Sequence, residues 1–250
     1  MKYTAKYFRE NLPSWKNKKD PLIAQYIYRP ISFYFSAFCA NKHISANTVS
    51  FFSISIAIIA CALFYFPTGT YHLWGAIFVN IWLLFDCIDG NIARGVKKQP
   101  FGEFADATSS YILIAFLYTA IGYAAYTEGG CLFERGNILV LLCGAIASTS
   151  DILMRLIHHK YLEGERKFIE QTGRIITTEN INDERDHGIK GRIKESLSIG
   201  GYLPIVILFA TIWHFLDIVV LYCLLFSMGL FFVLTTKTII KTIKINKEIG

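Results

Sequence analysis

The segment "NTVSFFSISIAIIACALFYF" (residues 47–66) contains no charged side chain. Its length matches the roughly 20 apolar residues that an α-helix needs to cross the hydrocarbon of a bilayer. Further apolar segments lie downstream, and several need flanking residues to reach that length: residues 72–85, 111–126, 137–150, 202–213 and 216–236. The pattern predicts an all-α integral membrane protein with six transmembrane helices.

The composition and the N-terminal region agree with a membrane protein. Hydrophobic residues make up 53% of the chain and aromatic residues 15%, which is typical of a membrane domain rather than a soluble one. The segment 21–40 is apolar and aromatic, but Arg29 and Pro30 interrupt it, so an N-terminal interfacial amphipathic helix is favoured over a further span. We interpret residues 1–250 as a single membrane domain, with residues 1–43 as a cytoplasmic or interfacial segment.

The lysines and arginines orient this domain. They gather before the first predicted span, between the second and third, after the fourth and at the C-terminus, and only Arg135 falls on the other side. By the positive-inside rule both termini are cytoplasmic. The net charge of +6 is then explained by topology and by attraction to anionic membrane lipids, so no nucleic-acid partner is expected. The charged segment 159–200 is predicted to be a cytoplasmic insert, either a solvated loop or part of a binding site.

Acidic residues cluster between the second and third predicted spans, in "FDCIDGNIARGVKKQPFGEFADATSS" (residues 85–110). A charged side chain near hydrocarbon is unfavourable by about 3 kcal/mol, so Asp86, Asp89 and Asp106 together indicate bound cations. Asp86 and Asp89 are three residues apart, which places them on one helix face. Carboxylate oxygens are the ligands that Mg²⁺ or Mn²⁺ prefers when it is bound together with substrate phosphates.

Two neighbours of these carboxylates suit a phosphate ligand. Gly90 has no Cβ, so a ligand can approach the backbone there. Arg94, one turn further along, supplies a permanent cation with a planar fork of donors. The spacing therefore predicts a site for a phosphorylated substrate and metal ions at the cytoplasmic mouths of two adjacent helices.

This stretch resembles the signature of the CDP-alcohol phosphotransferases, D-x-x-D-G-x-x-A-R followed after about eight residues by G-x-x-x-D-x-x-x-D. The six-helix layout, the N-terminal interfacial helix and the "ISANTVS" entry to the first span are also similar. There are two departures: seven residues rather than eight separate Arg94 from Gly102, and Ser110 stands where the family has its fourth aspartate. The matching positions are Asp86, Asp89, Gly90, Ala93, Arg94, Gly102 and Asp106.

The resemblance implies a bacterial inner-membrane transferase that faces the cytoplasm. Members pass the phospho-alcohol unit of a CDP-alcohol donor to an acceptor hydroxyl and release CMP. For this chain we expect a lipid or phosphorylated acceptor, in phospholipid or surface-glycan synthesis. Mg²⁺ or Mn²⁺ would be held by the three aspartates, with Asp106 and Arg94 acting in catalysis. Gly90, Ala93, Arg94 and Gly102 would bind the nucleotide. The resemblance also implies a homodimer, for which small residues on the third and fourth predicted spans permit close packing, between chains or within one chain: Gly122, Ala124, Ala125, Gly144, Ala145 and Ala147.

Ser110 leaves the fate of the acceptor proton open, because a serine hydroxyl does not take up a proton at neutral pH. The chain is then a non-catalytic binding relative that acts as a partner subunit, or Glu103 or Asp106 takes the proton, or the acceptor is already ionised. A cationic cluster at the end of the fourth span would suit an anionic acceptor or would anchor lipid headgroups: Arg155, His158, His159 and Lys160. Ser45 and Asn47 are predicted to cap the first span, and a nucleotide contact from Asn47 is the alternative.

Overall fold

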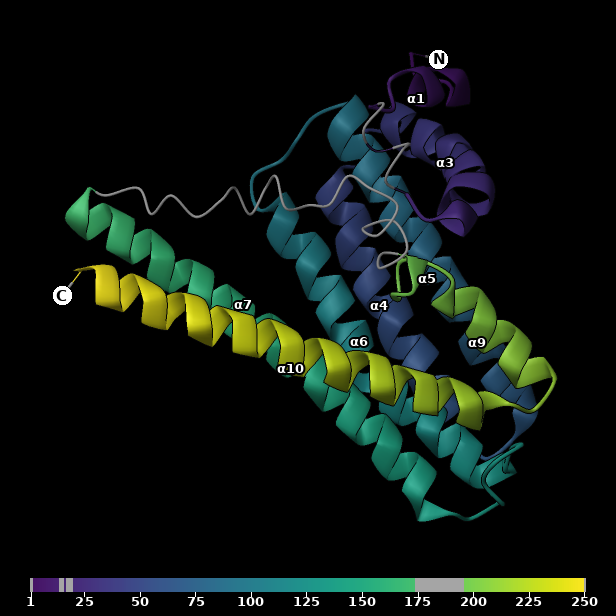
Figure 1. Ribbon diagram of the computed structural model, residues 1–250. Helices are drawn as coiled ribbons and strands as arrows, with labels where there is room; N and C mark the ends of the chain where they lie inside the picture. Colours follow the sequence, from purple (N-terminus) through teal and green to yellow (C-terminus); the bar gives the residue numbers. More distant parts are fainter. Residues whose placement is uncertain (1, 14–15, 17–19, 174–195, 250) are drawn as a thin grey trace.

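The computed structural model describes residues 2–13, 16, 20–173 and 196–249, and every regular element in these ranges is helical (Figure 1). The elements are α1 (Ala5–Glu10), the π-helix η1 (Ala24–Tyr28), α3 (Arg29–Asn41), α4 (Ala46–Phe64), α5 (Gly69–Gly95), α6 (Gly102–Glu128), α7 (Ile138–Thr172), α9 (Leu203–Ile212) and α10 (Leu216–Ile249). Polar side chains begin two of the long helices. The Ser45 hydroxyl accepts a hydrogen bond from the Thr48 amide at 3.1 Å, and the Asn137 side chain accepts one from the Leu139 amide at 3.0 Å.

Five helices in the described ranges are long and apolar enough to cross a membrane: α4, α5, α6, α7 and α10. This confirms an integral membrane protein built from helices. The segment 202–213, which the sequence predicts to be another span, forms the helix α9 of 10 residues. Ten residues rise about 15 Å, half of the roughly 30 Å hydrocarbon thickness, so the count of six spans is not confirmed.

The core lies where α4, α5 and α6 pack together and where α6 meets α7. Glycines let α6 and α7 approach closely, since a Cβ on Gly144 would lie only 2.3 Å from the Tyr118 carbonyl oxygen. Gly122 faces the same contact, with a built Cβ 3.1 Å from the Val140 carbonyl oxygen. Ala124, Ala125 and Ala147 are also buried within the chain. Apart from the half-buried Ala145, these small residues therefore serve packing within one chain rather than between two.

Helices α7 and α10 run side by side and extend together beyond the rest of the bundle (Figure 1). The ammonium of Lys241 on α10 lies 5.1 Å from the ring centroid of Tyr161 on α7 and 3.8 Å from the Glu165 carboxylate. Residues 159–172 of the predicted insert are thus a continuation of the fourth span. Residues 174–195 of that insert lie outside the described residues.

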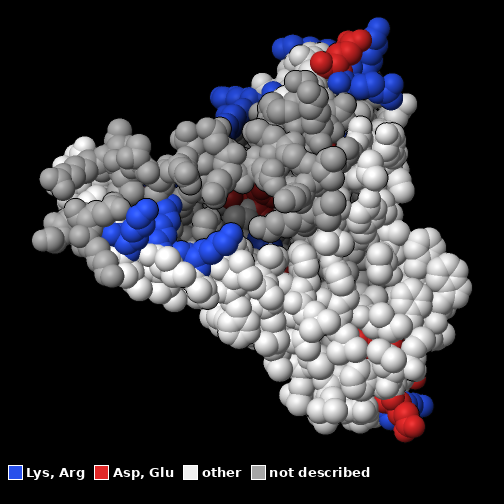
Figure 2. All heavy atoms as spheres, viewed as in Figure 1, with Lys and Arg blue, Asp and Glu red and all other residues white. Residues whose placement is uncertain are grey.

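Helix α3 presents aromatic side chains outward and polar side chains inward. Tyr34, Phe35 and Phe38 are at least half exposed, whereas Ser32 and Ser36 are completely buried. An exposed aromatic face is what a helix at a membrane surface would offer to lipid, and the interfacial location stays a prediction. Figure 2 shows uncharged atoms over most of the side of the bundle, with Lys and Arg gathered near the N-terminal helices and along the α7–α10 pair.

Candidate functional site

The candidate site forms where α5 ends and α6 begins. The amides of Val96 and Lys97 both donate to the Ile92 carbonyl, at 2.9 and 3.3 Å, which ends α5 and turns the chain. Phe101 precedes α6 with a left-handed φ of 58°. Helix α4 holds this connection in place, because the Asn47 side-chain amide donates to the Pro100 carbonyl at 2.9 Å. The turn therefore brings the two halves of the sequence motif to one end of the bundle.

An open cavity of about 530 Å³ lies at this end, between α4, α5 and α6. It collects six of the seven motif residues, and its other walls come from α4 and from the α5–α6 connection. Asp86, the seventh, stands beside it on α5. The lining residues are Ala46, Asn47, Ser50, Asp89, Gly90, Ala93, Arg94, Lys98, Gln99, Gly102, Glu103 and Asp106.

The three carboxylates have different neighbours. The side chains of Asp86 and Asp106 are in hydrogen-bonding contact across the two helices. Asp89 is buried and accepts a hydrogen bond from the Ser50 hydroxyl at 2.6 Å. In the described part of the chain, no three His, Cys, Asp or Glu side chains are close enough together to hold one metal ion. The structure thus brings Asp86 and Asp106 into contact, while Asp89 faces α4.

The chemistry of these donors fits a divalent cation. Two carboxylates in contact repel each other unless a proton or a cation lies between them. The oxygens of Asp86, Asp89 and Asp106 are hard ligands on the wall or at the edge of one open cavity, and such ligands suit Mg²⁺ or Mn²⁺. Ser50 was not singled out from the sequence. Its only signal is a hydroxyl near the start of a charge-free helix.

Arg94 folds back across Gly90. A Cβ built on Gly90 would lie 2.6 Å from the Arg94 Nη2 atom, so the missing side chain is what makes room for the guanidinium. A Cβ on Gly102 would lie 3.5 Å from the Asn47 Oδ1 atom, an ordinary contact. Gly102 therefore leaves open space in the cavity rather than relieving a clash.

Asn47 has a role other than the predicted helix cap. Ser45 is the cap of α4, and Asn47 instead bonds the α5–α6 connection through its amide nitrogen. Its Oδ1 atom is buried and has no hydrogen-bond partner among the residues that the structure describes. A buried acceptor without a partner is unfavourable by about 1–3 kcal/mol, so a ligand donor in the cavity would satisfy it.

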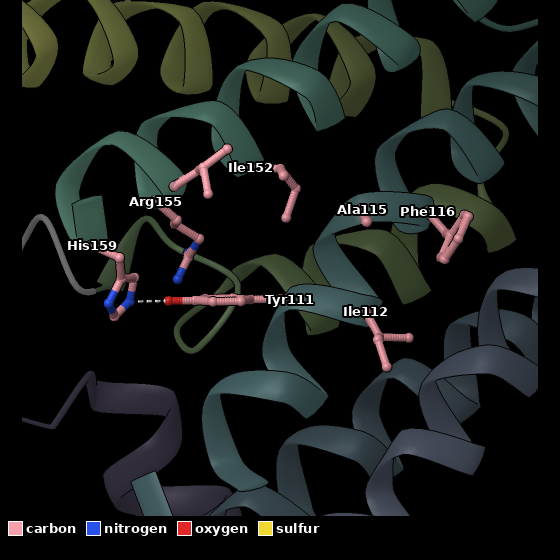
Figure 3. A pocket seen from close by; sticks show the side chains of 8 residues that line it. Tyr111, Ile112, Ala115, Phe116, Ile152, Arg155 and His159 are labelled. Atoms are coloured by element: carbon pink, nitrogen blue, oxygen red, sulfur yellow. Dashed lines mark hydrogen bonds between the residues drawn. The ribbon is translucent and has the colours of Figure 1, made fainter. Parts of the chain in front are cut away.

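A second cleft, of about 410 Å³, lies between α6 and α7 (Figure 3). Its walls are apolar, and polar groups stand at one end only. There the Tyr111 hydroxyl is hydrogen-bonded to the His159 Nε2 atom, and the Arg155 guanidinium lies 5.5 Å from the Tyr111 ring centroid. The lining residues are Tyr111, Ile112, Ala115, Phe116, Ile152, Arg155, Leu156 and His159.

The predicted cationic cluster is therefore only partly assembled at this cleft. Arg155 and His159 line it, whereas Lys160 pairs with Glu163 at 2.7 Å. Arg155 also donates from Nε to the Asp151 carboxylate at 2.7 Å, so part of its charge is already balanced. Glu103, the other residue predicted to take the acceptor proton, lines the cavity between α4, α5 and α6. It forms an exposed ion pair with Lys98 at 3.1 Å.

Comparison with known proteins gives two matches. A family model described as CDP-alcohol phosphatidyltransferase matches residues 43–226. A phosphatidylinositol phosphate synthase of Streptomyces avermitilis is 30% identical over 97 residues. That alignment spans 38% of each of the two chains, so it covers well under two thirds of the relative.

Proposed function

Since the chain belongs to the CDP-alcohol phosphatidyltransferase family, we propose that it transfers a phospho-alcohol unit from a CDP-activated donor to an acceptor and releases CMP. The family and the synthase relative support a membrane transferase of phospholipid synthesis. In the proposed reaction the acceptor oxygen forms a bond to the phosphorus of the alcohol phosphate. The bond from that phosphorus to the CMP oxygen breaks, and CMP leaves with the electron pair.

The observation that carries this proposal is the cavity at the end of α5 and α6, which gathers the motif residues around open space. Asp86, Asp89 and Asp106 would hold Mg²⁺ or Mn²⁺. When bound, such an ion would neutralise the charge that develops on the diphosphate and on the leaving CMP. Arg94 would bind a diphosphate oxygen from its place above Gly90. The distribution of Lys and Arg supports a cytoplasmic position for this cavity, as in a bacterial inner membrane.

The nucleotide would lie against the short residues of the two helices. Ala93 and Gly102 line the cavity and leave room for it. The buried Oδ1 atom of Asn47 would accept a hydrogen bond from the nucleotide's amino or hydroxyl group. These contacts orient the diphosphate toward the carboxylates.

We propose further that the acceptor is anionic or carries a phosphate near its reacting group. Ser110 cannot serve as a base, and its hydroxyl donates to the Asp106 carbonyl oxygen at 3.0 Å. If the reacting acceptor oxygen is itself ionised, no proton has to be removed. If it is a hydroxyl beside a phosphate, that phosphate would take up the hydroxyl proton as the new bond to phosphorus forms. The α6–α7 cleft supports this acceptor, because Arg155 and His159 stand at its polar end while its walls would accommodate an alkyl chain.

The test is metal-dependent release of CMP from a panel of CDP-alcohols, with total bacterial lipid extract as the source of acceptors and mass spectrometry of the products. Alanine at Asp86, Asp89 or Asp106 is expected to lower turnover by orders of magnitude while the purified protein keeps its thermal stability. Full activity in EDTA would contradict the metal requirement.

Ser110 also supports a second candidate, a relative that binds CDP-alcohol without turning it over and acts as a partner subunit. The two functions differ in one measurement. A non-catalytic relative would bind CDP-alcohol in the presence of Mg²⁺ but would release no CMP with any donor and acceptor tested. Release of CMP that is lost in the Asp89→Ala variant would exclude it.

A further inference from the structure

The polar face of α3 is turned into the protein, toward α5. Arg29 is 6% exposed and Ser32 and Ser36 are completely buried, although all three side chains are polar. A buried polar group is stable only when it is hydrogen-bonded, and a buried cation also needs a partner charge. The hydrogen-bond partners of these side chains therefore indicate the role of this face of α3.

Arg29 uses its guanidinium to join two other buried side chains. Its Nε and Nη2 atoms donate to the two carboxylate oxygens of Asp20, at 2.6 and 3.3 Å, and its Nη1 atom donates to the Asn91 Oδ1 atom at 2.9 Å. Burial raises the pKa of Asp20, but the hydrogen bond and charge of Arg29, together with Lys16, outweigh it and hold that pKa below its ordinary value. The ion pair is therefore charged at neutral pH.

Both the amide nitrogen and the amide oxygen of the Asn91 side chain are hydrogen-bonded to α3. Its side-chain nitrogen donates to the hydroxyls of Ser32 and Ser36, at 2.9 and 3.2 Å, while its oxygen accepts from Arg29. It is 3% exposed, so no water competes for either group. The side chain of Asn91 is thus held from both sides by α3.

Asn91 lies within two helical turns of the two carboxylates that α5 would contribute to the proposed metal site, Asp86 and Asp89. It follows Gly90 directly and lies two residues after Asp89. A rotation of Asn91 about the axis of α5 would also move its neighbours, because backbone hydrogen bonds join each residue of a helix to the residue four positions before it. Arg29 is also close enough to Asp86 for their charges to interact. Helix α3 therefore contacts α5 two residues from Asp89, and the charge of Arg29 also acts on Asp86.

We propose that Arg29 is a positioning residue for the metal site and that it acts through Asn91 on the turn of α5 bearing Asp86 and Asp89. This inference rests on the proposed function, because it concerns the same metal site. Groups that hold metal ligands in place typically account for about 10- to 100-fold in metal affinity or activity. Arg29 would be such a group, supplied by a helix outside the family motif.

The same N-terminal segment offers a matched control. Tyr28, the residue before Arg29, donates from its hydroxyl to the Asn80 Oδ1 atom on α5. Asn80 lies about 16 Å, or three helical turns, from Asn91 along α5. Tyr28→Phe therefore removes a hydrogen bond between the same two parts of the protein, about 13 Å along α5 from Asp89 and about 9 Å from Asp86.

The test compares Mn²⁺ binding in purified full-length variants, measured by electron paramagnetic resonance without any substrate. Asn91→Leu keeps the approximate volume and removes both contacts. Arg29→Lys keeps the charge but lacks the fork that reaches Asp20 and Asn91 together. Both changes are expected to weaken Mn²⁺ binding by about tenfold or more. Tyr28→Phe is expected to leave it within about twofold of the wild type, whatever it does to thermal stability.

The outcomes separate this inference from the proposed function. Wild-type Mn²⁺ affinity in both Asn91→Leu and Arg29→Lys, or equal weakening in Tyr28→Phe, would overturn the positioning role while leaving the metal site intact. The proposed metal site would be wrong if the wild-type protein bound no Mn²⁺, or if Asp89→Ala left its Mn²⁺ binding unchanged. The positioning role would then be wrong as well. In active protein, Asn91→Leu should lower kcat more than it raises KM for the CDP-alcohol.

Discussion

At the scale of single residues, Gly90 matters because the Arg94 guanidinium occupies the space of its missing side chain. Gly90→Ala should push that guanidinium away from the cavity and weaken CDP binding. Loss of a hydrogen bond to a charged group is unfavourable by about 1.5–3 kcal/mol, so the affinity should fall about tenfold or more. Isothermal titration of detergent-purified protein with CDP and Mg²⁺ measures this change.

The control for this variant is Gly229→Ala on α10, where a built Cβ meets no atom of the described part of the chain within 4 Å. It should bind CDP like the wild type. Gly102→Ala should be tolerated in the protein without ligand, because its Cβ makes only an ordinary contact, while Gly102→Val should obstruct the nucleotide. Unchanged CDP affinity in both Gly90→Ala and Gly102→Val would place the nucleotide elsewhere.

Ser110 gives a second prediction at this scale. A general base typically contributes about 10²- to 10⁴-fold in rate, but only where proton removal limits the reaction. Ser110→Asp should therefore give little gain with a phosphorylated acceptor. Initial rates of CMP release with neutral and phosphorylated acceptors measure this. A large gain in the rate of CMP release that is confined to neutral alcohols would contradict this prediction. It would mean that the chain is an impaired form of the family enzymes that carry the fourth aspartate.

The residues of the site divide into those that spacing reveals and those that it does not. Asp86, Asp89 and Gly90 lie within one or two helical turns, so their proximity follows from the sequence. Arg29 and Asn91 are 62 positions apart, and no helical period relates them. From the sequence alone Arg29 is an interruption of an interfacial helix, because a charge in an apolar segment looks the same whether it faces solvent or a buried partner.

At the scale of helices, the contact of α6 with α7 depends on Gly144. Its Cβ would lie 2.3 Å from the Tyr118 carbonyl oxygen, which belongs to the backbone and cannot turn aside. Gly144→Ala should therefore destabilise the protein by about 1–3 kcal/mol or more. Gly164→Ala is the control on the same helix, since its Cβ meets no atom of the described ranges within 4 Å and alanine is the better helix former by about 1 kcal/mol.

Thermal unfolding in detergent, followed by circular dichroism, distinguishes these two variants. The midpoint should fall in Gly144→Ala and stay level or rise in Gly164→Ala. Equal midpoints would mean that α6 and α7 separate readily. The same contact explains why the small residues leave both alternatives open in the sequence: they favour close packing without saying whether the second helix comes from the same chain.

Hydropathy located the helices well but not their ends. Helix α7 runs 22 residues beyond the apolar segment that ends at residue 150, to Thr172. Lys167 pairs with Glu163 one turn away at 2.7 Å, and such pairs stabilise a helix in water where no apolar pattern marks it. Conversely, the segment 202–213 is apolar enough for a membrane span, but the helix it forms, α9, has only 10 residues and is too short to cross.

At the scale of the whole molecule, we predict that the protein is a homodimer, as the family resemblance implies. Because Gly144 and Gly122 pack within the chain, the dimer must use other surfaces, and Gly144→Ala should not dissociate it at temperatures where it is folded. Native mass spectrometry or mass photometry in nanodiscs gives the number of chains. A monomer both in mild detergent and in nanodiscs would refute this prediction.

The antiparallel pair α4 and α5 also bears on how the protein enters the membrane. From Ala46 to Phe85 the chain contains no Asp, Glu, Lys or Arg, and the turn between the helices, residues 65–68, is equally uncharged. Translocating a charged residue through the bilayer centre is unfavourable by about 2.5–3.5 kcal/mol, so this pair can insert as one hairpin without that barrier. The turn joining α6 and α7 must instead carry Glu134 and Arg135 across. Insertion of the hairpin leaves Asp86 and Asp89 at the surface from which it entered, before α6, which carries Asp106 near its start, has inserted.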